Sequence, residues 1–353
     1  MSDLFKYDAV TAKCRCIIGQ LLTKEQYMNL IASRTLADAV AYLKDETAYA
    51  DLLDSVEPSR AHRAHLEQLL ENNLLDAYIK LYTFTSGAER RFIGYLVEEL
   101  ELRYLLDAIR ATEYDDSMEF YSIPQFIRDH AAIDFKRIFR TSSSAEMLEA
   151  LKGSEYFDTL YPIMSGDKWS FADVEAALVH SYYKKLITKY ASVFSGDQKK
   201  RVQAMISEKI DLLNISVILR MRRFNALREG SERVKLDFTT VMPKLIPISG
   251  RLREPDVIAL CSEELSLDET IERFAALYKK PGKLFAEQNA TGEYGSEYLF
   301  GQARRLAANP HPSFDVVLGC LSLIKFETDN LIYILEALRY GVAADKIEQS
   351  IIV

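Results

Sequence analysis

One pattern of polar and apolar residues occurs three times along the chain, in segments with the spacing of amphipathic helices. Each segment begins with an acid and has a polar residue three positions later. Apolar residues follow at the fourth, seventh and eighth positions after the acid, and an arginine at the twelfth. The segments are residues 98–110, 211–223 and 327–339. Because the starting acids recur at intervals of 113 and 116 residues, about a third of the chain, we predict one helical unit repeated three times.

The polar residues of this repeated motif are its candidate site residues. They are Glu98, Glu101, Arg110, Asp211, Asn214, Arg223, Glu327, Asn330 and Arg339. At about 100° per residue, the starting acid lies within the apolar arc of its helix, and the arginine lies at the edge of that arc. A carboxylate there needs hydrogen bonds or a cation, because burying an unpaired charge is costly. We expect each starting acid to bind basic residues or backbone amides of its own copy, as a structural rather than a catalytic residue.

Other helices recur upstream of the motif. One helix has matching apolar positions in the first two copies, and a small helical module before it has an apolar seam that ends in Tyr49, Tyr156 or Tyr278. Polar breaks at residues 112–117 and 228–232 separate the copies. We therefore predict an all-α chain of three similar helical-bundle domains, with boundaries at residues 1–117, 118–232 and 233–353.

Composition supports a helical, non-secreted protein. Glycine and proline are scarce, with 14 and 9 residues, and turns of all-β proteins would use more of both. The net charge of −8 argues against nucleic-acid binding. Four cysteines are too few for a disulfide framework. The longest mostly apolar run, residues 316–324, is far shorter than a membrane span. The N-terminus carries an acid early and has no apolar core, unlike a signal peptide, so we expect a soluble chain.

Motifs for metal or redox chemistry are weak. His62 and His65 are three residues apart on a predicted helix, but Arg63 lies between them and no zinc-protease pattern surrounds them. We interpret both as residues of a solvated helix face. Cys14 and Cys16 lack the spacing and the second pair of a zinc or redox site, so we interpret them as core or edge residues. The sequence predicts no metal ion and no cofactor.

Motifs for nucleotide chemistry are missing from the sequence. It contains no Gly-rich phosphate loop, no dinucleotide fingerprint that follows a strand and no nucleophile elbow. A basic cluster, Arg220, Arg222, Arg223 and Arg228, is a candidate phosphate site. The other two copies lack its equivalent, so we favour a solvated or partner-facing helix end. We therefore predict that the chain is not an enzyme and binds no nucleotide directly.

The triplicated motif resembles the C subunit of the prokaryotic V-type (A-type) ATPases, the counterpart of the d subunit of the eukaryotic enzyme. The resemblance covers essentially the whole chain and is most specific at residues 211–223, at residues 326–341 and from Leu245 to Gly250 leading to Tyr278. Residues 7–15 are also similar to the first helix of the family. The first copy departs from the pattern, because it has Glu101 where the family favours asparagine.

This resemblance implies a funnel of three domains around a pseudo-threefold axis. Such a protein is non-catalytic and lies on the cytoplasmic face of the membrane, peripheral to it. It links the central stalk to the membrane rotor ring of proteolipid subunits, for proton or sodium transport. A helical adaptor unrelated to rotary ATPases would explain the missing chemistry equally well. A third alternative is a metal- or phosphate-dependent helical enzyme that uses His62, His65 or the cluster around Arg220.

Overall fold

The fold is built from helices. The computed structural model describes residues 6–114, 123–166, 168–226, 236–246, 250–262, 264–286 and 294–353. Within these residues every secondary-structure element is an α-helix or a 3-10 helix, which confirms the all-α prediction. The chain forms two compact units, one made of residues 1–89 and 283–353 and the other of residues 90–282.

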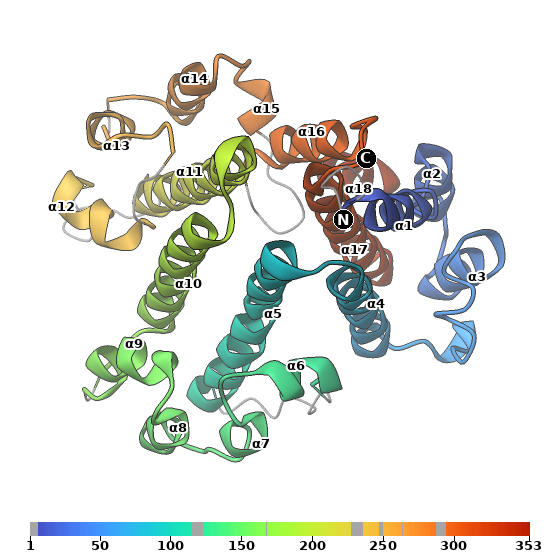
Figure 1. Ribbon diagram of the computed structural model, residues 1–353, viewed down its shortest axis with the longest axis horizontal. Coiled ribbons are helices and arrows are strands. Elements are labelled where there is room, and N and C mark those ends of the chain that lie inside the picture. The colour runs from blue at the N-terminus through green and yellow to red at the C-terminus, as the bar shows by residue number, and fades with distance from the viewer. Residues whose placement is uncertain are drawn as a thin grey trace. The chain divides into compact units, whose positions relative to one another are not determined.

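The first unit combines the two ends of the chain around a pair of long helices. Its elements are α1 (Asp8–Ile18), α2 (Lys24–Ile31), α3 (Leu36–Glu46), η2 (Pro58–Arg60), α4 (Arg63–Phe84), α15 (Lys283–Ala286), α16 (Ser296–Ala307), α17 (Phe314–Arg339) and α18 (Ala344–Ser350). Helices α4 and α17 lie side by side, and α1 and α16 also pack on α17 (Figure 1). The N-terminal and C-terminal segments therefore share one core.

Helix α17 is the centre of this unit because its first half is apolar on almost every face. Nearly all residues from Phe314 to Ile324 are buried. Gly319 allows α16 to approach closely, since a Cβ atom at this position would lie 2.4 Å from the backbone nitrogen of Ala307. A helix that is hydrophobic all round has to be enclosed by neighbours, and α1, α4 and α16 supply them.

The second unit contains the other long helices. Its elements are α5 (Gly87–Tyr114), α6 (Gln125–His130), α7 (Phe135–Ile138), α8 (Ser144–Leu151), α9 (Glu155–Met164), α10 (Phe171–Val193), α11 (Gly196–Ala226), α12 (Phe238–Val241), η4 (Met242–Lys244), α13 (Glu254–Leu260) and α14 (Leu267–Tyr278). Helix α10 packs against α9 and α11, and α11 also contacts α14 (Figure 1).

The turns that lead into two of the long helices are alike. Gly87 begins α5 and Gly196 begins α11, and both have a φ of 58°. This left-handed conformation strains residues that carry a Cβ atom.

The helices before these turns are also alike, because α4 buries Leu66 and Leu70 at the positions where α10 buries Val174 and Leu178. These matching burial patterns confirm that the apolar positions of this helix recur in the first two copies.

Three small modules accompany the long helices. The first module is residues 20–57 with α2 and α3, the second is residues 123–166 with α6 to α9, and the third is residues 250–282 with α13 and α14. Side-chain hydroxyls begin most of their helices: the N-cap residues of α2, α3, α8, α9 and α14 are Thr23, Thr35, Ser143, Ser154 and Ser266. Most residues of the predicted apolar seams are buried, which confirms those helices as amphipathic.

The predicted boundaries after residues 117 and 232 lie outside the described residues. The division into three domains at residues 1–117, 118–232 and 233–353 therefore stays a prediction.

Candidate functional site

Each of the three motif helices carries a buried carboxylate that accepts hydrogen bonds from a small module. We call this arrangement a carboxylate socket. It consists of one motif carboxylate, one or two backbone amides from the first part of a module and the tyrosine that ends the apolar seam of that module. The pairs are Glu101 on α5 with Tyr156, Asp211 on α11 with Tyr278, and Glu327 on α17 with Tyr49.

The Asp211 socket is fully enclosed. The Oδ2 atom of Asp211 accepts hydrogen bonds from the backbone nitrogens of Arg251 at 2.6 Å and Leu252 at 3.1 Å, and from the Tyr278 hydroxyl at 2.7 Å. Burial raises the pKa of Asp211, although these three bonds and the nearby Arg253 favour the charged form. A Cβ atom at Gly250 would lie 2.2 Å from the same oxygen, so the module approaches the carboxylate through a glycine.

The Glu327 socket has the same plan with a second tyrosine. Its Oε2 atom accepts hydrogen bonds from the backbone nitrogen of Leu22 at 2.7 Å and from the Tyr27 hydroxyl at 3.4 Å. Its Oε1 atom accepts one from the Tyr49 hydroxyl at 2.8 Å. Burial raises the pKa of Glu327 to about 7, against the opposing effect of these hydrogen bonds. The first module is thereby bound to α17 by its start and by its end.

The motif asparagines hold a second backbone segment beside two of the sockets. Asn214 accepts a hydrogen bond from the backbone nitrogen of Ile246 at 2.9 Å and donates one to its carbonyl at 3.0 Å. Asn330 makes the same pair with Ile352, at 3.2 Å and 2.7 Å. An amide side chain that bonds both polar groups of one residue fixes that residue's position and leaves neither of its backbone groups unpaired.

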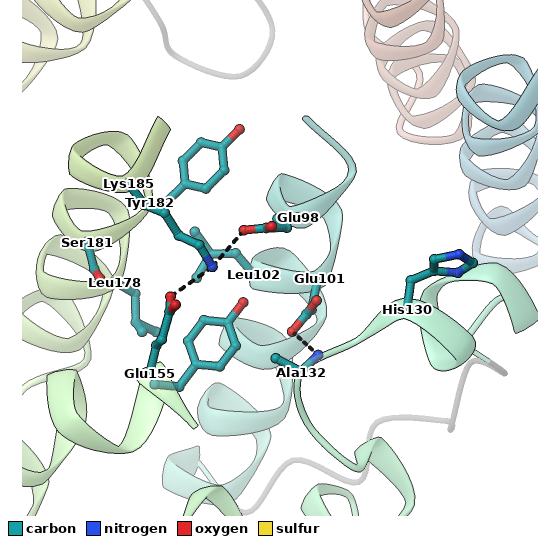
Figure 2. A pocket seen from close by; sticks show the side chains of 11 residues that line it. Glu98, Glu101, Leu102, His130, Ala132, Glu155, Leu178, Ser181, Tyr182 and Lys185 are labelled. Carbon is teal, nitrogen blue, oxygen red and sulfur yellow. Dashed lines mark hydrogen bonds and ion pairs between the residues drawn. The ribbon is translucent and has the colours of Figure 1, made fainter. Parts of the chain in front are cut away.

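The first socket departs from the predicted register by three residues. Figure 2 shows Glu101 bonded to the backbone nitrogen of Ala132, at 3.3 Å, and Tyr156 is a further hydrogen-bond partner of Glu101. Glu98 forms ion pairs with Lys185 at 3.0 Å and Lys189 at 3.4 Å, and its side chain is 28% exposed. The expectation that Glu98 is the buried acid of this copy is wrong. Residues three apart share a helix face, so a glutamate at the asparagine position can take over the socket.

The expectation that the starting acids bind partners of their own copy is also wrong. With the predicted boundaries, Asp211 belongs to the second copy and Tyr278 to the third, while Glu327 belongs to the third copy and Tyr49 to the first. Each module thus binds the motif helix that precedes it in the cyclic order of copies. Amphipathic spacing shows which face of a module is buried, but it does not identify the helix that covers this face.

The motif arginines lie outside the sockets. Arg110, Arg223 and Arg339 are all exposed, and the Arg110 guanidinium stacks over the ring of Phe171 at 4.6 Å. They therefore take no part in the socket hydrogen bonds that fix the modules.

The role of Arg222 differs from the one expected from the sequence. We interpreted the basic cluster as a solvated or partner-facing helix end, but Arg222 is only 8% exposed. It donates to the carbonyls of Leu260, at 3.3 Å, and Leu265, and to the Thr270 hydroxyl. It therefore fixes the connection between α13 and α14. Arg228, the last member of the cluster, lies outside the described residues.

A pocket opens beside the first socket and is lined by Glu98, Glu101, His130, Tyr156 and Lys185, among others. In Figure 2 the Lys185 ammonium lies between Glu98 and Glu155, and its distance to the Glu155 carboxylate is 2.8 Å. The His130 ring lies away from these three side chains. Burial lowers the pKa of Lys185, but its bonds to Glu155 and Glu98 outweigh this effect and raise the pKa overall. The lysine therefore stays a cation and neutralises the carboxylates around it.

The remaining candidates for metal chemistry are dispersed. His62 and His65 are exposed on or beside α4, which confirms the solvated-face interpretation. Cys14 is buried and Cys16 is exposed, as expected for core and edge residues. No group of three or more His, Cys, Asp or Glu side chains within the described ranges is placed to hold a metal ion. None of the helices in these ranges combines the length and apolar character needed to cross a bilayer.

Comparison with known proteins identifies the family. The family described as ATP synthase (C/AC39) subunit matches residues 10–350. The chain belongs to this family. The relatives include the C subunit of the A-type ATP synthase from Thermococcus kodakarensis, 27% identical over 61% of this chain and 56% of the relative. The protein of that name from Thermococcus onnurineus is 26% identical over 74% and 67% of the two chains.

A third relative matches along nearly the full length. The C subunit of the A-type ATP synthase from Archaeoglobus fulgidus is 22% identical over 98% of this chain and 95% of its own. By contrast, the alignment with the Thermococcus kodakarensis protein spans little more than half of that relative. The resemblance deduced from the triplicated motif is confirmed by the family match.

Proposed function

We propose that the chain is a non-catalytic coupling subunit of a rotary V-type (A-type) ATPase. The observation that carries the proposal is the family match over residues 10–350. A helical adaptor unrelated to rotary ATPases is not favoured, because family membership accounts for the whole chain. A metal- or phosphate-dependent enzyme is not favoured either, since His62 and His65 are exposed and Arg222 is used within the fold.

The sockets suit a part that transmits torque. Such a part needs helices that keep their relative positions under load. Each socket fixes a module by hydrogen bonds to a buried carboxyl group, and leaving these buried groups unpaired would be costly. The asparagine pairs of Asn214 and Asn330 add a second attachment beside two sockets. A rigid, repeated helical scaffold is therefore a reasonable coupling element between a stalk and a ring.

The finer arrangement is part of the same proposal. We infer three similar domains, at residues 1–117, 118–232 and 233–353, around a pseudo-threefold axis. Their partners are the central-stalk subunits and the membrane rotor ring of proteolipid subunits, with the chain peripheral on the cytoplasmic face. Among the motif residues, the exposed Arg110, Arg223 and Arg339 are the ones that a partner can reach. The socket carboxyl groups instead bind backbone amides and tyrosines of this same chain.

The test is recovery of the complex from membranes. The tagged full chain is expressed with its own ATPase, the membranes are solubilised, and bound proteins are identified by mass spectrometry. We expect the stalk proteins and the ring protein together with the chain. A tagged helical protein of similar size and charge serves as the control. Recovery of neither the stalk nor the ring proteins would contradict the proposal.

A further inference from the structure

The three sockets differ in their charge, and the difference singles out Glu327. The positive charge of Lys185 favours the ionised form of Glu101, and the positive charge of Arg253 favours the ionised form of Asp211. Glu327 is 4% exposed, and its hydrogen-bond donors are one backbone amide and the hydroxyls of Tyr27 and Tyr49, all neutral. No ion pair among the described residues includes Glu327.

A cation of α4 and a cation of α17 itself pair with carboxylates other than Glu327. On α4, Arg63 binds Glu67 at 3.4 Å and Glu336 at 3.0 Å. On α17 itself, Lys325 binds Asp329 at 2.9 Å. Other neighbours present neutral groups to α17. On α1 the backbone carbonyl of Cys14 accepts a hydrogen bond from the Cys320 thiol, and the carbonyl of Ile352 accepts one from Asn330. On α16 the Phe300 ring packs against Phe326, and the Arg304 guanidinium lies over that Phe300 ring.

Burial without a cation disfavours the charged form of a carboxyl group. The socket therefore favours a protonated Glu327, and the pKa of about 7 agrees with this geometry. When the first module leaves α17, the carboxyl group meets water and regains its ordinary, lower pKa. At a pH between these two pKa values, Glu327 binds more protons when the module is attached than when it is detached. The module's attachment is strongest below the lower value and weakens as the pH rises towards 7.

We propose that the first module is a proton-linked latch on α17. It closes with uptake of one proton from water by Glu327, and it loosens when this carboxyl group ionises. The inference concerns α2 and α3 only, and it does not rest on the proposed function.

Hydrogen exchange of the full chain tests the latch. Protection factors of peptides from α2 and α3 are measured between pH 5 and 7, each corrected for the intrinsic exchange rate at that pH. Proton linkage predicts that the opening equilibrium constant rises on the order of thirtyfold over this interval. Glu327→Gln imitates the protonated group, so its opening constant should be independent of pH. Equal pH profiles for Glu327→Gln and the wild type would overturn the proposal.

Two further variants separate a proton latch from a purely structural contact. Tyr49→Phe removes a donor that favours the ionised form, so the pH profile should move to higher pH. Glu336→Gln changes an ion-paired carboxyl group of the same helix and should leave the profile of the first module unchanged. A Tyr49→Phe profile that moves to lower pH, or a Glu336→Gln profile that becomes flat, would contradict the assignment to Glu327.

A direct titration keeps the proposal testable if Glu327→Gln does not fold. Glutamate carboxyl groups of the wild-type chain are labelled with 13C, and the Glu327 signal is assigned by its loss in Glu327→Asp. We expect a midpoint close to 7. A midpoint at the ordinary value of an exposed glutamate would overturn the proposal.

Discussion

Replacing Asp211 with alanine tests whether the sockets hold the fold together. The substitution leaves the amides of Arg251 and Leu252 and the hydroxyl of Tyr278 without their acceptor in a fully buried site. A buried donor that loses its partner costs about 1–3 kcal/mol. Burial raises the pKa of Asp211, so the charged side chain itself carries a desolvation cost that its removal relieves. We therefore expect a net loss of about 2–4 kcal/mol in the free energy of unfolding.

The measurement is thermal and urea unfolding of the full chain. The sequence has a single tryptophan, Trp169, which lies in the same unit as Asp211, so its fluorescence reports on that unit. For a unit of this size, about 1 kcal/mol corresponds to roughly 2–4 °C, so Tm should fall by about 5–15 °C. Asp211→Asn keeps the shape and one acceptor, so its effect should be smaller.

Lys200→Ala is the control on the same helix. The Lys200 side chain is 80% exposed and its ion pair with Asp197 spans one helical turn, so we expect a change below about 0.5 kcal/mol. A Tm for Asp211→Ala that equals the Tm of this control would refute the reasoning, because it would mean that the three bonds add nothing to stability.

Other substitutions examine neighbouring features of the fold. Gly250→Ala places a Cβ atom against Asp211 and should cost about 1–3 kcal/mol in the free energy of unfolding. Its effect should be smaller when Asp211 is already alanine, and a double-mutant cycle measures this difference. Arg222→Met should cost about 2–4 kcal/mol, because the buried carbonyl of Leu260, the half-buried carbonyl of Leu265 and the Thr270 hydroxyl lose their donor. Urea unfolding checks it, and an Arg222→Met variant as stable as the wild type would contradict the prediction. Asn330→Ala should free the C-terminal segment at Ile352, and unchanged protection of that segment in hydrogen exchange would contradict this.

Much of the Asp211 socket and of the Glu327 socket is visible in the sequence. The repeated spacing identifies Asp211 and Glu327 as acids within an apolar arc, and the ends of the small modules identify Tyr278 and Tyr49. The pairing of these residues is not visible, because Tyr278 is 67 positions from Asp211 and Tyr49 is 278 positions from Glu327. Local spacing describes one helix at a time, whereas a pair of this kind depends on how two elements pack.

By itself the sequence determined the helical class, the family and the faces that are buried. The helical class and the buried faces follow from the period of apolar residues along the chain, because that period is set by the geometry of a single helix. The family follows from the resemblance of the triplicated motif. Only the tertiary structure decided that Glu101 rather than Glu98 lies in the first socket, that Arg222 is buried, and that the first module binds α17. Those outcomes depend on which neighbour covers a given face, and hence on the free energy of packing the whole chain.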